Sequence, residues 1–135
     1  MKTYRQQLII TSDEPEQFLN LSYEVEECVR RSLISDGLCV VYSQHTTSAV
    51  FLENDREQLY TDWSEMLKKI VPGESEYKVD YSSAGAAHMK QMLLGASVTV
   101  PITDGRLELG SRQYIMYGDF DGCREKTVLV KIIGE

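Results

Sequence analysis

The sequence carries little positive charge, few cysteines and no long apolar run. Its 135 residues have a net charge of −7 at pH 7. Sequence-independent binding to DNA or RNA needs a basic surface that displaces phosphate counterions, so we expect no nucleic-acid partner. The same shortage of basic residues argues against a polybasic membrane anchor. No apolar stretch approaches the length of a membrane span, and no apolar signal-peptide core is visible, so we expect no membrane partner.

Only three cysteines are present, Cys28, Cys39 and Cys123, and no two of them form a C-x-x-C pair. An odd number of unpaired cysteines is typical of reduced thiols rather than of a disulfide framework. We therefore expect a cytoplasmic protein. Cys123 lies in a predicted turn and could be reactive, but a free turn cysteine is the simpler interpretation.

The composition, with 42% hydrophobic and 26% charged residues, indicates one globular domain over residues 1–135. Asp13 and Glu16 have the spacing of a capping box and predict a helix that runs through Val29. A second helix is predicted from a cap at Asn54 or Asp55 to residue 70, and a short third over 83–94. Strand patterns occur at 3–10, 38–42, 49–52, 97–102, 106–109, 113–117 and 125–133. The pattern predicts an α+β domain on a mixed β-sheet, with two longer helices and one short helix.

One segment between two apolar runs is unusually rich in polar groups. His45 stands among hydroxyl side chains after the predicted strand 38–42, and Glu53, Asn54 and Asp55 directly follow the predicted strand 49–52. Polar groups at the ends of buried strands are costly unless they are paired or used. A functional site is one interpretation, and an ordinary turn with a capped helix start is the other.

Two histidines, His45 and His88, are the only ones in the sequence. A metal site usually takes three or four ligands, so a carboxylate would have to complete the set. The candidates are Glu53, Asp55, Asp62 and Asp80. Nothing like an H-x-x-x-H spacing is present, and the alternative for each histidine is a hydrogen-bonded, structural imidazole.

Basic residues stand close to glycines in the C-terminal third, namely Arg106, Arg112, Arg124 and Lys126. Arginine next to the backbone N–H groups of glycine-flanked turns suits a phosphate. The alternative is a set of solvated turn charges, which we favour for Arg106. Gln113 opens an apolar strand, so we expect its amide to face a turn or a pocket.

Several of these motifs follow one another in an order that resembles a known family. The matching segments are Gln44–Ala49, Asp62, Val71–Pro72, Tyr77, His88–Lys90, Leu94–Ser97, Val100–Pro101, Gly105–Arg106, Leu109–Gln113, Asp121–Arg124 and Gly134–Glu135. In these segments, and over nearly the whole chain, the sequence resembles the YjbQ-like family, often labelled secondary thiamine-phosphate synthase.

The resemblance implies a compact α+β protein that assembles as a homotrimer, with sites near the subunit contacts. It also implies histidines that hold a divalent metal (Zn²⁺ or Mg²⁺) and arginines that hold a small anionic molecule. The implied activity is a weak transferase reaction, which couples a pyrimidine methyl diphosphate to a thiazole phosphate and releases pyrophosphate. His45, His88, Gln113 and Arg124 match polar positions of the family.

The sequence departs from the family pattern at three places. Val79 stands where the family has a metal-binding histidine, and in an extended segment we expect the neighbouring Asp80 to point to the other side. The family's Asn-Glu pair is reversed as Glu53-Asn54, and the family's tryptophan before the glutamine is Arg112. The loss of the histidine at position 79 weakens the expected metal site.

Three hypotheses follow from the sequence. The first is a metal-assisted enzyme of the thiamine-phosphate synthase type. The second is a non-catalytic, trimeric binding protein for a small anionic metabolite, and the third is an interaction role without a ligand. Catalytic roles are predicted for His45, Glu53 and Gln113, anion contacts for Thr46, Thr47, Arg112 and Arg124, and metal ligation for His45, His88 and Asp80.

Overall fold

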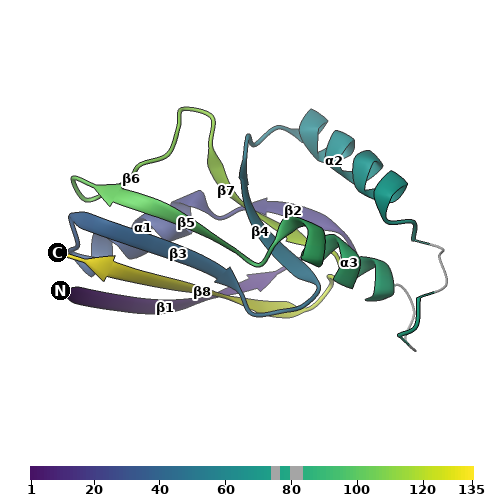
Figure 1. Ribbon diagram of the computed structural model, residues 1–135, viewed down its shortest axis with the longest axis horizontal. Coiled ribbons are helices and arrows are strands. Elements are labelled where there is room, and N and C mark those ends of the chain that lie inside the picture. Colours follow the sequence, from purple (N-terminus) through teal and green to yellow (C-terminus); the bar gives the residue numbers. More distant parts are fainter. Residues whose placement is uncertain (74–76, 80–83) are drawn as a thin grey trace.

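The computed structural model describes residues 1–73, 77–79 and 84–135. Within these residues the chain forms eight strands and three helices, shown in Figure 1. In chain order they are β1 (Lys2–Thr11), β2 (Gln17–Asn20), α1 (Ser22–Ser32), β3 (Asp36–Ser43), β4 (Ser48–Glu53), α2 (Glu57–Ile70), α3 (Ala84–Leu94), β5 (Ser97–Thr103), β6 (Arg106–Leu107), β7 (Tyr114–Asp119) and β8 (Glu125–Gly134).

The strands form two sheets. One sheet has five strands in the order β1-β8-β3-β5-β6, and the other has three in the order β2-β7-β4. The α+β class is confirmed. In detail, every strand pair among the described residues is antiparallel, so the expected single mixed sheet is wrong. The third helix, predicted over 83–94, is confirmed as α3 (Ala84–Leu94), although with 11 residues it is as long as α1 and not shorter.

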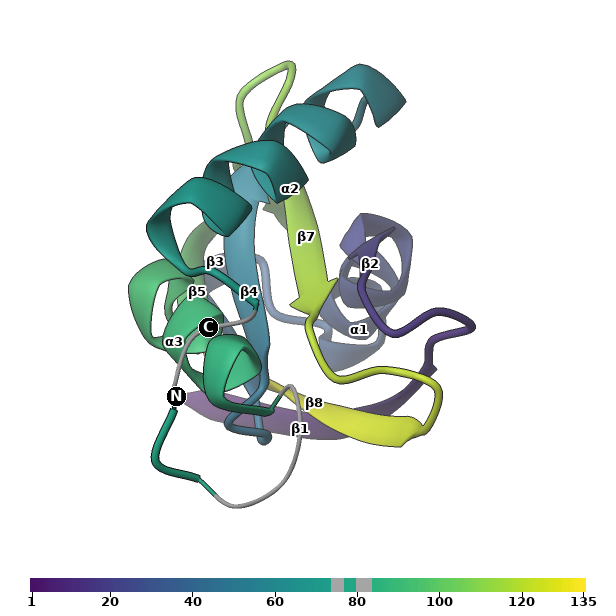
Figure 2. The ribbon, with the colours of Figure 1, turned by 90° about the vertical axis from the view of Figure 1, so that its right-hand side faces the viewer.

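The core lies between the two sheets. One face of the five-stranded sheet packs against α1 and the three-stranded sheet, through residues such as Val25, Val41, Tyr117 and Val130. The other face of the three-stranded sheet packs against α2 and α3, where Leu67 and Ala87 are buried. Figure 2 shows α2 lying across β4 and β7. The three-stranded sheet is thus covered on both faces, and this packing fixes the positions of its strand ends.

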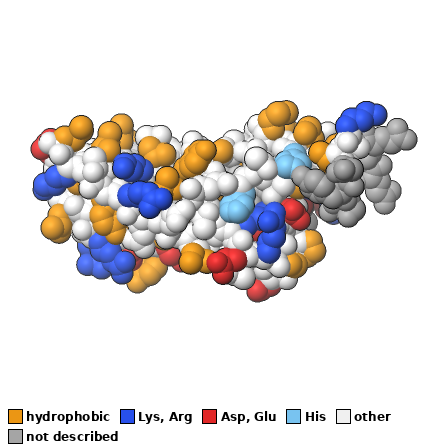
Figure 3. All heavy atoms as spheres, turned by 90° about the horizontal axis from the view of Figure 1, so that it is seen from below, with side chains coloured by type: hydrophobic (Ala, Val, Ile, Leu, Met, Phe, Trp, Pro, Cys, Tyr) orange, Lys and Arg blue, Asp and Glu red, His pale blue; other side chains and the backbone are white. Residues whose placement is uncertain are grey.

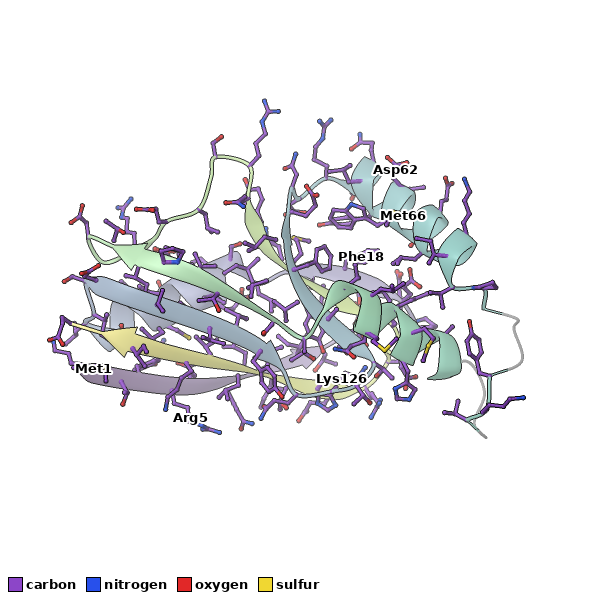
Figure 4. The ribbon with its side chains drawn as sticks, viewed as in Figure 1. Met1, Arg5, Phe18, Asp62, Met66 and Lys126 are labelled. Carbon is purple, nitrogen blue, oxygen red and sulfur yellow. The ribbon has the colours of Figure 1, made fainter. Side chains whose placement is uncertain are left out.

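The first helix begins later than the capping box at Asp13 and Glu16 predicts, so the predicted start is wrong. Residues 17–20 form strand β2, which pairs with β7, and α1 begins only at Ser22. Glu16 does not cap a helix, because its carboxylate contacts Lys90 (2.8 Å) and Ser64 (2.7 Å). Phe18, which is labelled in Figure 4, packs edge-on against Trp63 of α2, and the ring centroids are 5.1 Å apart. Tertiary packing of this segment therefore outweighs its local capping signal.

The second face of the five-stranded sheet is open to solvent at several apolar positions. Leu38 and Tyr42 of β3 are each 45% exposed, and Ile133 of β8 is 37% exposed. Leu38 lies directly opposite Ile133 in the β3–β8 pair.

No helix of the described residues is long and apolar enough to cross a membrane.

Candidate functional site around His45

Three chain segments meet at one end of the two sheets. The loop between β3 and β4 carries His45, the turn between β7 and β8 carries Arg124, and Ser12 follows the end of β1. The pairing of Ser48 with Asp119 places the start of β4 beside the end of β7. The start of β8, with Lys126, lies at the same end and is visible in Figure 4. Residues from distant parts of the sequence are therefore brought together here.

The imidazole of His45 is held by the backbone of β8. Its Nε2 accepts a hydrogen bond from the backbone N–H of Thr127 at 3.1 Å. The loop is fixed by a second contact, because Gln44 N donates to Thr127 O at 3.3 Å. A backbone N–H is always the donor, so Nε2 carries no proton and the proton of the neutral ring sits on Nδ1. His45 therefore offers an N–H donor at Nδ1.

Burial and the charges around His45 favour the neutral ring. Burial lowers the pKa of His45, and the positive charges of Lys126 and Arg124 lower it further, against a smaller opposing effect of Asp119. Protonation would also place an N–H of the ring against the N–H of Thr127. A neutral ring with a fixed tautomer is the state that this environment favours.

A buried ion pair lies directly beneath this loop. Lys126 Nζ is 2.6 Å from Asp119 Oδ1, and the two side chains are 0% and 1% exposed. The ammonium also donates to Thr47 Oγ1 (2.9 Å) and Ser48 Oγ (2.8 Å). Asp119 Oδ2 accepts from Ser12 Oγ at 2.7 Å. Every charge in this cluster is therefore paired, as a buried charge requires.

The hydroxyl of Thr47 faces this ion pair and not the solvent, since Thr47 is only 4% exposed. Thr46, its neighbour, is exposed. Arg124 is also exposed, and its guanidinium contacts Asp121 Oδ2 at 3.3 Å. Of the four predicted anion contacts, Thr46 and Arg124 lie at the His45 end with side chains accessible to a ligand.

Three further predicted site residues, Glu53, Arg112 and Gln113, lie at the opposite end of the three-stranded sheet. Glu53 pairs with Tyr114 across β4 and β7, while Ser48 pairs with Asp119. Six-residue strands span about 17 Å, so Glu53, Arg112 and Gln113 are roughly that far from the start of β4. Gln113 Oε1 accepts from Gly110 N at 2.8 Å, and Glu53 Oε1 accepts from Asn54 N at 2.7 Å. The structure does not bring these residues together with His45.

His88 lies on α3 and is half-buried. Figure 3 shows both histidine side chains of the chain on one face of the molecule. Val79 is 41% exposed, and Asp80 lies outside the described residues. Within the described part of the chain, no group of three or more His, Cys, Asp and Glu side chains could hold a metal ion. The predicted metal ligands therefore form no complete set among the residues that can be placed.

The Lys126–Asp119 pair was missed by the sequence interpretation, although a signal for it exists. Lys126 occupies the inward-facing register of β8, in phase with the buried Val128 and Val130. A lysine at an inward position of an apolar strand indicates a buried charge with a partner.

Comparison with known proteins gives a consistent result. The family described as UPF0047 protein YjbQ-like matches residues 6–135. A UPF0047 protein of Archaeoglobus fulgidus is 39% identical over 118 residues, which cover 87% of this chain and 91% of that protein. UPF0047 protein YugU of Bacillus subtilis is 31% identical over 128 residues, with 94% and 97% covered.

Solved structures show the same fold. A YbjQ-like protein of unknown function from Sulfolobus solfataricus superimposes with a TM-score of 0.94 at 26% identity, with 99% of both chains covered. A YjbQ/UPF0047 protein of Clostridium acetobutylicum gives a TM-score of 0.90 at 33% identity, covering 95% of this chain and 99% of that one.

Proposed function

The chain belongs to the YjbQ-like UPF0047 family, and we propose that it binds a small phosphorylated molecule between His45 and Arg124. One observation carries the proposal. The N–H of Thr127 occupies Nε2 of His45, so Nδ1–H of the neutral ring, which has no partner among the described residues, is a hydrogen-bond donor near an exposed arginine. Donors of this kind suit the oxygens of a phosphate.

The surrounding charges favour an anion at this position. Lys126 is neutralised by Asp119, whereas the guanidinium of Arg124 is 54% exposed and, among the described residues, has one ion-pair contact, with Asp121, at 3.3 Å. A phosphate can replace or share this contact and can also accept from the exposed hydroxyl of Thr46. The net charge of −7 limits the partner to a small anion, because a polyanion would be repelled.

The metal-assisted synthase is the alternative. It requires His45 as a ligand, but neutral imidazole binds a metal through its unprotonated nitrogen, which here is Nε2. Thr127 N–H occupies that atom. The ring would have to turn, and further ligands would have to come from outside the described residues. Metal binding and the thiamine-phosphate synthase reaction therefore stay predictions, and a metal-independent anion site is the better supported function.

Self-assembly is the second part of the proposal. The homotrimer expected from the resemblance is supported by the open face of the five-stranded sheet, where Leu38, Tyr42 and Ile133 are exposed on neighbouring strands. Apolar groups that cluster on an exposed sheet face favour contact with another chain. Size-exclusion chromatography with light scattering tests this directly. A trimer that becomes a monomer in Leu38→Glu supports the proposal, and a wild-type monomer contradicts it.

The location proposed for the protein remains the cytoplasm. All three cysteines are free, and Cys28 and Cys39 are buried without a disulfide partner. Free buried thiols suit a reducing compartment.

Calorimetric titration with phosphate and pyrophosphate, in the presence of EDTA, tests the anion site. We expect binding by the wild type and a loss of about tenfold or more in Arg124→Gln, because a charge-assisted hydrogen bond contributes about 1.5–3 kcal/mol. The matched control is Arg106→Gln, which removes an exposed arginine of β6 in the five-stranded sheet and is expected to leave the affinity unchanged. Equal losses in both variants, or binding that requires added Zn²⁺ or Mg²⁺, would contradict the proposal.

A further inference from the structure

The buried ion pair between Lys126 and Asp119 joins the parts of the proposed site. All three N–H bonds of the Lys126 ammonium are used, toward Asp119, Ser48 and Thr47, at 2.6–2.9 Å. A buried ion pair is weak evidence for stabilisation, because desolvation of the two charges offsets much of their attraction. What distinguishes this pair is the set of segments that it connects.

On one side, Lys126 holds the loop that carries His45. Thr47 and Ser48 follow His45 by two and three residues, and both hydroxyls accept from Lys126 Nζ. On the other side, Asp119 holds the turn that carries Arg124. Its Oδ1 accepts from the backbone N–H of Asp121 at 3.3 Å.

Ser12 extends the same connection. Its hydroxyl donates to Asp119 Oδ2 at 2.7 Å and accepts from Cys123 N at 3.1 Å. Cys123, next to Arg124, has a φ of 63°, and its backbone N–H makes this contact. The turn before β8 is therefore tied at two backbone N–H groups to the acceptors around Asp119.

The backbone of β8 adds a third link. Arg124 precedes Lys126 by two residues, and Thr127 follows it directly. The side chain of Lys126 points inward, and the backbone N–H of Thr127, the next residue, donates to the ring of His45. A change in the position of Lys126 is thus transmitted to both groups that face the ligand.

We propose that Lys126 is a positioning residue, which fixes the tautomer of His45 and its distance to Arg124 without touching the ligand. This inference rests on the proposed anion function, because it concerns the residue that arranges the same site.

The first test substitutes Lys126→Met and measures two properties of the folded variant. The ¹⁵N resonances of the His45 ring report its tautomer, and calorimetry reports the affinity for pyrophosphate. We expect one protonated and one unprotonated nitrogen in the wild type, averaged nitrogens in Lys126→Met, and an affinity lower by tenfold or more. An unchanged tautomer together with unchanged affinity overturns the proposal.

A milder pair of variants decides the matter if Lys126→Met does not fold. Thr47→Val keeps the shape of the side chain but removes an acceptor of Lys126, whereas Thr47→Ser keeps the hydroxyl. We expect averaged His45 nitrogens and weaker pyrophosphate binding in Thr47→Val, with both properties retained in Thr47→Ser. A fixed tautomer in Thr47→Val overturns the positioning role.

The two proposals fail separately. If the wild type does not bind phosphate or pyrophosphate, but Thr47→Val still averages the His45 nitrogens, then the anion function is wrong and the positioning role stands. If the wild type binds and Thr47→Val changes neither property, the positioning role is wrong and the anion function stands.

Discussion

Replacing Asp119 by asparagine tests the buried charge cluster beneath His45. The substitution keeps the shape of the side chain and removes its charge. The ammonium of Lys126, which is 0% exposed, is then left without an anion. Removing one partner of a buried ion pair costs about 3–5 kcal/mol, which is a large part of the roughly 5–15 kcal/mol that stabilises a typical domain. Asp119→Asn is therefore expected to be severely destabilised.

Urea unfolding followed by circular dichroism measures this loss of free energy of unfolding. A thermal melt gives a second measure. For a domain of this size, each kcal/mol lowers Tm by about 3 °C, so we expect Tm to fall by about 9–15 °C. Asp121→Asn is the matched control, because its partner Arg124 is 54% exposed and such a pair contributes about 0–1 kcal/mol. Adding Lys126→Met to Asp119→Asn removes the stranded charge and restores part of the stability. A loss below about 1 kcal/mol in Asp119→Asn would refute the reasoning.

Three further predictions concern other parts of the chain. Ellman's reagent is expected to label one thiol of the native protein, the exposed Cys123. Cys39 should not react, because burial raises the pKa of its thiol to about 12. Rapid labelling of two or more thiols would contradict this prediction. Gly105→Ala should lower the free energy of unfolding in urea by about 1–2 kcal/mol, because Gly105 has a φ of +77°. Gly73→Ala, where no described atom lies within 4 Å of the added Cβ, should be nearly neutral. Equal effects in the two variants would contradict this prediction. The pKa of His45 is lower in the folded chain than its unfolded value of about 6.5. The neutral His45 ring therefore adds to the free energy of unfolding above about pH 6.5, and this contribution is lost as the pH falls through the folded pKa. Urea unfolding at pH 7.5 and 5.5 should show the advantage of the wild type over His45→Gln shrinking at the lower pH, and a growing advantage would reverse the sign of this argument.

Much of the fold could be predicted from local patterns. The apolar runs that became β1, β3, β4 and β8 are bounded by polar or turn residues, and Gly95 ends α3 with a φ of +97° as a helix-ending glycine does. Strand β2 could not be predicted in this way. Its four residues follow a capping signal, and only pairing with β7, about a hundred residues later, makes them a strand.

Part of the candidate site can be located from the sequence. His45 stands between two apolar runs and Arg124 stands beside a glycine-flanked turn, and the fold places both at one end of the sheets. Glu53 and Gln113 were grouped with them, but the antiparallel register of β4 and β7 puts these two at the far end. The sequence does not state which strand ends meet, because that depends on the pairing of strands that are distant in the chain.

The tautomer of His45 was beyond sequence reasoning for a related reason. It depends on the N–H of Thr127, a group that every non-proline residue carries and that no sequence pattern distinguishes.

The most direct test of the central claim is ¹⁵N NMR of the His45 ring during a titration with pyrophosphate in EDTA, with His88→Gln used to assign the signals. We expect a neutral ring protonated at Nδ1 before addition, and a shift of the Nδ1–H resonance on binding that is absent in Arg124→Gln. A ring protonated at Nε2, or an Nδ1–H resonance that pyrophosphate leaves unmoved, would contradict the anion site.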